Sequence, residues 1–173
     1  IGCGRIRTVR VLLLTPLFPP DTGGAAVLFN LYFELLCEDS DVERVTVLCE
    51  KDARLPRGER VHEKGTVLRY LPLLGRIDGY HTRNVTYRST RVLMRSISML
   101  CLLPVLSRVL RIDVIHFHCT FGHVQGRFRN RIVEWALRLS RGRTVCDVQD
   151  QRGLALHRRA ADAFCAASLK ICE

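Results

Sequence analysis

A mostly apolar run that ends in prolines and then in two adjacent glycines constrains this chain most. Residues 9–14 (VRVLLL) lack the alternation of a half-exposed strand, which predicts a central parallel strand covered on both faces. The three prolines within residues 16–20 end that strand and hold an extended loop. Gly23 and Gly24 then let backbone N–H groups approach a ligand at a helix N-terminus, which suits a phosphate or another anion. An ordinary strand-to-helix turn would show the same pattern.

Strand-like and helix-like segments alternate along the rest of the chain. This alternation predicts an α/β fold, a Rossmann-like doubly wound parallel sheet with helices on both faces. Residues 1–173 suffice for one domain with a substantial core. Further strands are expected at 45–49, 66–71, 114–118, 144–148 and 163–166, helices at 25–38, 87–111, 126–141 and 154–160, and an exposed loop over 51–64.

The spacing of apolar residues predicts which side of each helix faces the core. The first helix is expected to bury Val27, Leu28, Leu31 and Leu35, with Asn30, Glu34 and Glu38 opposite. The helix over 126–141 is expected to bury Phe128, Ile132, Trp135 and Leu139. Pro104 is expected to split or kink the helix over 87–111.

Three loops are the expected place of a functional site. Doubly wound sheets bind ligands outside the carboxyl ends of their strands, near the point where the strand order reverses. That rule selects residues 19–24, 118–123 and 149–153, which follow the first, fourth and fifth expected strands. These loops hold the least core-like residues of the chain, so we place the site there.

Two histidines in the fourth expected strand could carry chemistry. His116 and His118 alternate with a phenylalanine, so both project from the same face of the strand. Together with Cys119 and His123 they could form a zinc cluster, but the spacing matches no well-known zinc site, and no metal is expected. His116 is expected to be a partly buried, hydrogen-bonded residue, and His118 either lines a pocket or serves the core.

Carboxylates flank Gln149 at the end of the fifth expected strand. Asp150 could orient a substrate hydroxyl or cap the following turn, and Asp147 lies on the other side of the glutamine.

Nucleic acid is not an expected partner, because the sequence lacks interleaved aromatic and basic residues and only 7% of it is aromatic.

Charge and cysteine usage narrow the partners and the compartment. The net charge is +10, and no acidic residue occurs from 79 to 112, which favours anionic partners or simply solvated arginine-rich helix faces. The eight cysteines form no C-x-x-C pair, which indicates a reducing compartment, and a cytoplasmic location is expected.

Four segments together resemble the N-terminal domain of family-4 retaining glycosyltransferases of the GT-B fold. These segments are VRVLLLTPLFPPDTGGAAVLFNLYFELL, DVIHFHCTFG, TVCDVQD and ADAFCAASLKICE, in the order and spacing of that family. The resemblance implies an acceptor-side half-enzyme that works with a C-terminal donor-binding domain, in the same chain or in a separate subunit. It implies transfer from a nucleotide-sugar donor with retention, without a cofactor or a required metal. The chain is expected to be a fragment that is inactive alone.

The resemblance also assigns residues. It implies that Gln149 and His118 take part in catalysis, and that Gly23, Gly24 and His118 line the substrate site. Thr22, Phe121 and Asp150, in the same three loops, are also expected to bind the substrate. Many members have a histidine where Gln149 stands, and a glutamine cannot take up a proton near neutral pH.

The resemblance further implies a carbohydrate or lipid-linked acceptor. Some relatives rest on anionic membranes, and the side of the 87–111 helix with Arg88, Arg91 and Arg95 suits the same contact at the inner face of the membrane. Two other functions stay open. One is a binding or regulatory module that keeps the fold and has lost the transfer reaction, and the other is a different Rossmann-like enzyme that uses a nucleotide or a phosphorylated metabolite.

Overall fold

A seven-stranded sheet forms the centre of the protein. The computed structural model describes residues 8–50, 56–71, 85–118, 127–148 and 163–166. The strands lie in the order β3-β4-β2-β1-β5-β6-β7, and every pair is parallel except β3 with β4. Their bounds are β1 Val9–Leu14, β2 Val42–Glu50, β3 Gly58–Arg60, β4 Gly65–Tyr70, β5 Val114–His118, β6 Arg143–Val148 and β7 Ala163–Ala166.

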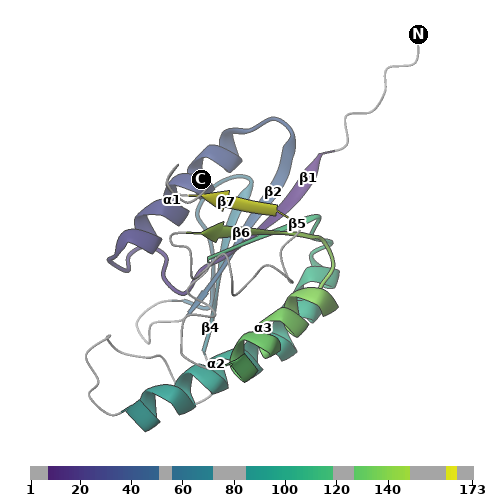
Figure 1. The fold of residues 1–173 in the computed structure, drawn as a ribbon. Coiled ribbons are helices and arrows are strands. Elements are labelled where there is room, and N and C mark those ends of the chain that lie inside the picture. Colours follow the sequence, from purple (N-terminus) through teal and green to yellow (C-terminus); the bar gives the residue numbers. More distant parts are fainter. Residues whose placement is uncertain (1–7, 51–55, 72–84, 119–126, 149–162, 167–173) are drawn as a thin grey trace.

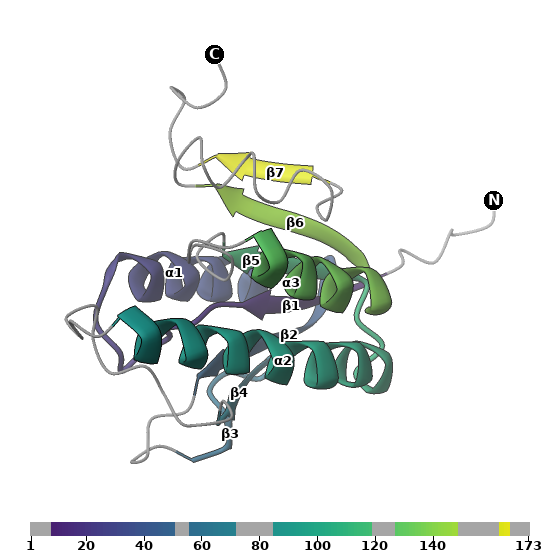
Figure 2. The same ribbon diagram turned by 60° about the horizontal axis from the view of Figure 1, so that its bottom comes forward.

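Within the described residues, three helices cover the two faces of this sheet. Helix α1 (Gly24–Glu38) lies on one face, and α2 (Val85–Val109) and α3 (Arg127–Leu139) lie side by side on the other (Figures 1 and 2). Successive residues of β1 point to opposite faces, so Leu12 packs in the core under α2 and α3 while Leu13 packs in the core under α1. The predicted class, a Rossmann-like doubly wound α/β fold, is confirmed.

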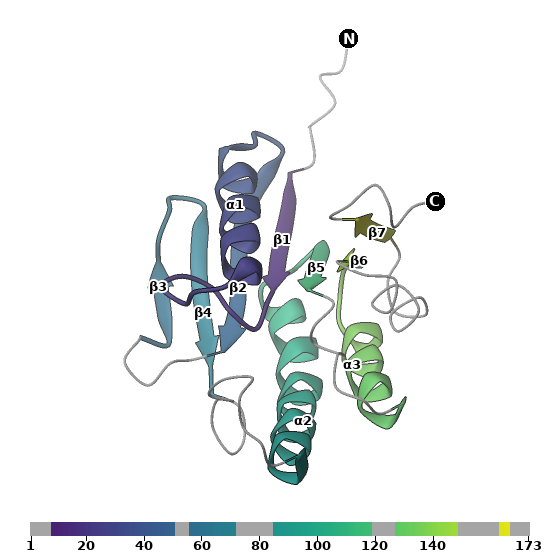
Figure 3. The same ribbon diagram turned by 60° about the vertical axis from the view of Figure 1, so that its left-hand side comes forward.

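The strand order reverses between β1 and β5. From β1 the chain passes to β2 and β4 on one side, and it then crosses to β5 on the other side of β1. Leu14 pairs with Phe117, and His118 pairs with Asp147, so the carboxyl ends of β1, β5 and β6 lie at the same end of the sheet. We call this end of the sheet the rim. The loop from β1 to α1 also lies there (Figure 3).

The predicted rotation of α1 is wrong. The helix buries Ala26, Phe29, Phe33 and Cys37 against the sheet, whereas Val27, Leu31 and Leu35 are exposed. Helix α1 is apolar on nearly every side, so aliphatic spacing alone did not fix its orientation. The aromatic rings bury more area than the aliphatic side chains, and they occupy the core.

Other expectations are corrected in detail. Helix α3 buries Ile132 as expected, but Trp135 and Leu139 are about half exposed, and Val133, Ala136 and Leu137 fill the core instead. The exposed segment expected to be a loop contains the short edge strand β3. Helix α2 continues through Pro104 to Val109. The expected helix over 154–160 lies outside the described residues.

Among the residues that the structure describes, none of the helices combines the length and the hydropathy needed to span a membrane.

Candidate functional site

The loop between β1 and α1 is held by hydrogen bonds to strands β2 and β4 and by one within the loop. The Thr15 amide donates to the Leu48 carbonyl over 3.1 Å, and the Thr15 hydroxyl donates to the Leu17 carbonyl over 2.9 Å. From β4, the buried guanidinium of Arg69 donates to the Pro19 carbonyl over 3.0 Å. Phe18 is buried edge-to-face against Phe33 of α1. The loop is therefore anchored at its first residue and across its middle, which favours a preorganised binding loop.

The start of α1 projects its backbone at the rim. Gly23 has φ +139°, a conformation that side chains rarely adopt, and its carbonyl accepts the first helical hydrogen bond from Val27. Among the residues that the structure describes, no side chain caps this helix start, and no acidic residue lies in its first turn. Thr22, Gly23 and Gly24 are exposed there. A methyl group on Gly24 would meet nothing within 4 Å. The arrangement suits an anion at the helix N-terminus.

A polar cluster lies beneath the rim, between α1 and strands β5 and β6. The His118 Nε2 and Asp147 Oδ2 atoms are 4.0 Å apart, and their side chains are only 1% and 0% exposed. The Tyr32 hydroxyl of α1 donates to the other oxygen of Asp147 over 3.4 Å. A buried carboxylate facing an imidazole can orient that ring. The cluster thus connects side chains of α1 with the ends of β5 and β6.

His116 lies two residues before His118 in β5, on the same face and farther from the rim. Its ring packs against Tyr32 at 4.9 Å and Phe29 at 5.5 Å between ring centres, and Phe29 also contacts the ring of His118. Burial lowers the pKa of His116 to about 4, so its imidazole is neutral at physiological pH. The prediction that the two histidines share one face is confirmed, and so is the partial burial of His116. Among the described residues, its buried Nε2 atom has no hydrogen-bond partner.

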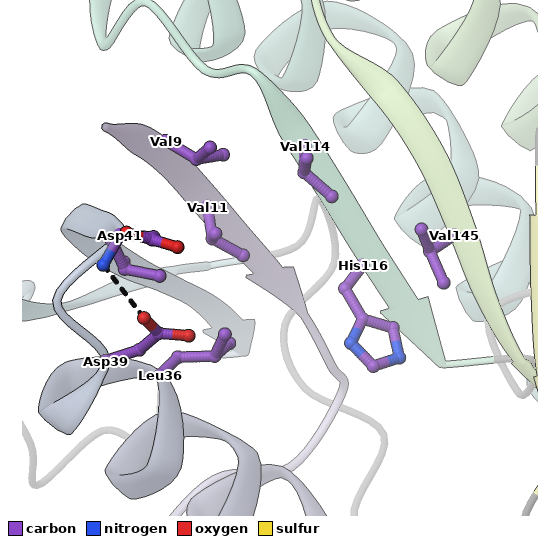
Figure 4. A pocket seen from close by; sticks show the side chains of 9 residues that line it. Val9, Val11, Leu36, Asp39, Asp41, Val114, His116 and Val145 are labelled. Atoms are coloured by element: carbon purple, nitrogen blue, oxygen red, sulfur yellow. Dashed lines mark hydrogen bonds between the residues drawn. The ribbon is translucent and has the colours of Figure 1, made fainter. Parts of the chain in front are cut away.

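A shallow hollow of about 290 Å³ opens on this face toward the opposite end of the sheet. Figure 4 shows its aliphatic walls, with the ring of His116 on one side and two carboxylates, Asp39 and Asp41, on the other. The Asp41 amide donates to the Asp39 carboxylate over 2.8 Å, so one of the two carboxylates is already engaged. Because it lies along β1 and β5 from Val9 and Val114 onward, the hollow is separate from the rim.

The structure brings some of the predicted site residues together. Thr22, Gly23 and Gly24 lie at the rim, and His118 lies beneath it rather than on its surface. The remaining predicted residues fall outside the described residues: Phe121, Gln149 and Asp150, with Cys119 and His123 of the zinc alternative. In the parts of the chain that are described, no group of three or more metal-ligating side chains gathers.

The sequence did not single out Tyr32 of the buried cluster, and it offered Asp147 only as a carboxylate beside Gln149. The strand register pairs His118 with Asp147, and a parallel alignment of the two expected strands could have revealed this carboxylate. Tyr32 gave no usable signal, because it stands in an apolar helix whose rotation was mispredicted.

The sheet order and the rim together define a Rossmann-like α/β domain of the doubly wound class. A solved structure of sucrose-phosphate synthase from Thermosynechococcus elongatus superposes on this chain with a TM-score of 0.62. The match covers 93% of this chain and 77% of that chain at 10% sequence identity. The chain therefore shares the fold of that structure, and at this identity the likeness bears on the fold alone. No protein-family model and no curated protein matches the sequence.

Proposed function

We propose that this chain is the acceptor-side domain of a retaining glycosyltransferase of the family-4 type, acting with a donor-binding domain on a nucleotide-sugar. The observation that carries the proposal is the start of α1, which lies uncapped at the rim beside the point where the strand order reverses. The fold likeness to a sucrose-phosphate synthase and the four family-like segments support it. Here Thr22, Gly23 and Gly24 receive a phosphate or sugar hydroxyl through backbone donors.

In this proposal His118 acts from beneath the rim. Asp147 and Tyr32 fix the position of the His118 ring, and this ring lies beneath the substrate group at the end of β5. Gln149, Phe121 and Asp150 remain proposed substrate contacts on sequence grounds, with Gln149 and His118 as the proposed catalytic pair. The donor sugar and its phosphates are substrate, so the proposed reaction needs no cofactor from this chain.

The variant Gly24→Ala tests the role of the glycine loop. Because an added methyl group meets nothing within 4 Å, it should leave the free energy of unfolding within about 0.5 kcal/mol of wild type. A bound phosphate would contact that methyl group, so binding should weaken by roughly tenfold or more. Titrations with inorganic phosphate and a panel of hexose phosphates, followed by NMR, measure this.

A matched control is available on the edge strand. Gly58→Ala adds a methyl group at ordinary contact distance, 3.5 Å from Leu68, and β3 is separated from β1 by two strands. It should leave binding unchanged. Equal affinities for wild type and Gly24→Ala would mean that the loop is an ordinary strand-to-helix turn.

Transfer itself is tested with the donor-binding half supplied, in the same chain or as a partner. We expect nucleoside diphosphate release from a nucleotide-sugar and a product with the anomeric configuration of the donor. The alternative function, a binding module without transfer, is favoured by Gln149 in place of the family's histidine. Hexose phosphate binding without any transfer would select that alternative. Tight nucleotide binding by this chain alone would select a different Rossmann-like enzyme.

A cytoplasmic location and contact of the arginine-rich side of α2 with an anionic membrane remain part of the proposal. One of its arginines is engaged elsewhere, because Arg95 forms an ion pair with the buried carboxylate of Glu50. Vesicle co-sedimentation that depends on anionic lipid and a lipid-linked acceptor would support this part. Equal binding to neutral and anionic vesicles would remove it.

A further inference from the structure

The outward face of α1 combines exposed aliphatic side chains with carboxylates. Val27, Leu31 and Leu35 are 70%, 49% and 56% exposed, and they follow one another at helical i, i+4 spacing. Glu34 and Glu38 are exposed on the same side of the helix. We call this set of five residues the acidic face. In a chain of net charge +10 such a face is exceptional, since five of the 17 carboxylates fall within residues 34–43.

On the other side of the sheet, the C-terminal turns of α2 and α3 carry the opposite combination. Val105 and Val109 of α2 are 58% and 70% exposed, and Trp135 and Leu139 of α3 are 48% and 53% exposed. The Arg141 amide donates to the Ser107 hydroxyl over 2.9 Å, so these two turns lie side by side. The exposed charges there are arginines. We call the following set the basic face: Val105, Arg108, Val109, Arg131, Trp135, Arg138 and Leu139.

The two faces share one spacing with opposite charge. Helix α1 reads Leu31-x-x-Glu34-Leu35, α2 reads Val105-x-x-Arg108-Val109, and α3 reads Trp135-x-x-Arg138-Leu139. Residues three and four apart lie on one side of a helix, so each motif presents two apolar groups with a charge beside them. Hydrogen bonds within the helix hold two of these three charged side chains. Glu34 accepts a hydrogen bond from Asn30 at 2.7 Å, and Arg108 donates to the Pro104 carbonyl at 3.0 Å.

We propose that the acidic face of one copy of this chain docks on the basic face of a second copy. The apolar side chains supply the buried area, and the carboxylate–guanidinium pairs set the register. The faces lie on opposite sides of the sheet, so a copy that docks through one still offers the other (Figure 2). The contact is therefore heterologous, and assembly continues beyond the dimer until a ring closes or a filament grows.

Charge reversal in two separate variants tests this directly. Glu34→Arg with Glu38→Arg makes both faces basic, and Arg108→Glu with Arg138→Glu makes both faces acidic. Because like charges then oppose each other, each variant should associate roughly a hundredfold more weakly than wild type. An equimolar mixture should regain association, since each basic face meets an acidic one. Light scattering against protein concentration measures the mass, and circular dichroism checks that each variant is folded.

Different results of these experiments support or overturn the proposed self-association. For the wild type we expect a mass that rises with concentration and falls with added salt, because salt screens exposed charges. Glu63→Arg, an exposed charge reversal in the turn between β3 and β4, should leave that mass unchanged. A wild-type mass of one chain at all soluble concentrations in low salt overturns the proposal. So does failure of the mixture to associate. Loss of anionic-vesicle binding on reversing the basic face, with a single-chain wild type, would assign that face to a bilayer.

Discussion

Strands β5 and β6 present two different faces. Toward α2 and α3 they bury Ile115, Phe117 and Cys146 in a close-packed core. Toward α1 the alternate residues of the same strands place His118 and Asp147 together, with both side chains almost completely buried. These two strands therefore contribute to a packed core on one side and to a polar cluster on the other.

The difference shows where this fold leaves room for chemistry. A buried polar group costs stability unless it is partnered, so a polar cluster is retained where it serves something other than packing. The cluster contacts Phe29 and Tyr32 of α1, and the start of the same helix is the part that we propose binds the substrate. The apolar face fixes the strands, and the polar face connects them to the rim.

The largest expected effect is on the apolar face. Phe117→Ala should lower the free energy of unfolding by about 3–5 kcal/mol, because the side chain is fully buried and its removal leaves a cavity. Urea denaturation followed by circular dichroism measures the change. His116→Ala, one residue away on the polar face, should cost clearly less. Equal losses would show that the two faces contribute alike to stability.

The polar face should respond to a change of charge without a change of size. Asp147→Asn keeps the shape of the side chain but removes the carboxylate that faces His118 and accepts from Tyr32. We expect a loss of about 1–3 kcal/mol in the free energy of unfolding. Glu63→Gln removes an exposed charge and should change stability by less than about 0.5 kcal/mol. A neutral or stabilising Asp147→Asn would mean that the carboxylate serves function at the expense of stability.

The sheet could be predicted from the sequence because buried parallel strands are nearly continuous apolar runs. The expected strands differ from the observed ones by at most a few residues. Strand β2 begins at Val42 rather than at residue 45, where Val42 pairs with Val9 across an irregularity in the register. Strand β3 was missed because its residues are all exposed and it pairs only at the edge of the sheet.

The contacts beneath the rim could be predicted only in part. The glycines and His118 stand out in the sequence because their residue types are unusual beside a strand end. Tyr32 and Asp147 join them through the rotation of α1 and the pairing of β5 with β6. A helix that is apolar on most sides carries no periodic signal for its rotation, and strand pairing is a long-range property that local patterns do not contain.

The smallest expected effect is a difference in pH dependence on the polar face. Burial lowers the pKa of His116 to about 4, whereas an unfolded histidine has a pKa near 6.5. Between these values the unfolded chain takes up a proton that the folded chain refuses, so stability falls as the pH is lowered from 6.5 to 4. The ring is only partly enclosed, so we expect about 1–2 kcal/mol from this group, all of it lost below pH 4.

His116→Phe isolates that contribution. An aromatic ring of similar size keeps the packing against Phe29 and Tyr32 but does not titrate. Urea denaturation at several pH values should therefore give the variant a shallower loss of stability than wild type between pH 6.5 and 4, with the two profiles parallel above pH 7. Parallel profiles over the whole range would show that His116 takes up its proton equally well in the folded chain, and its ring would then be hydrated in the folded state.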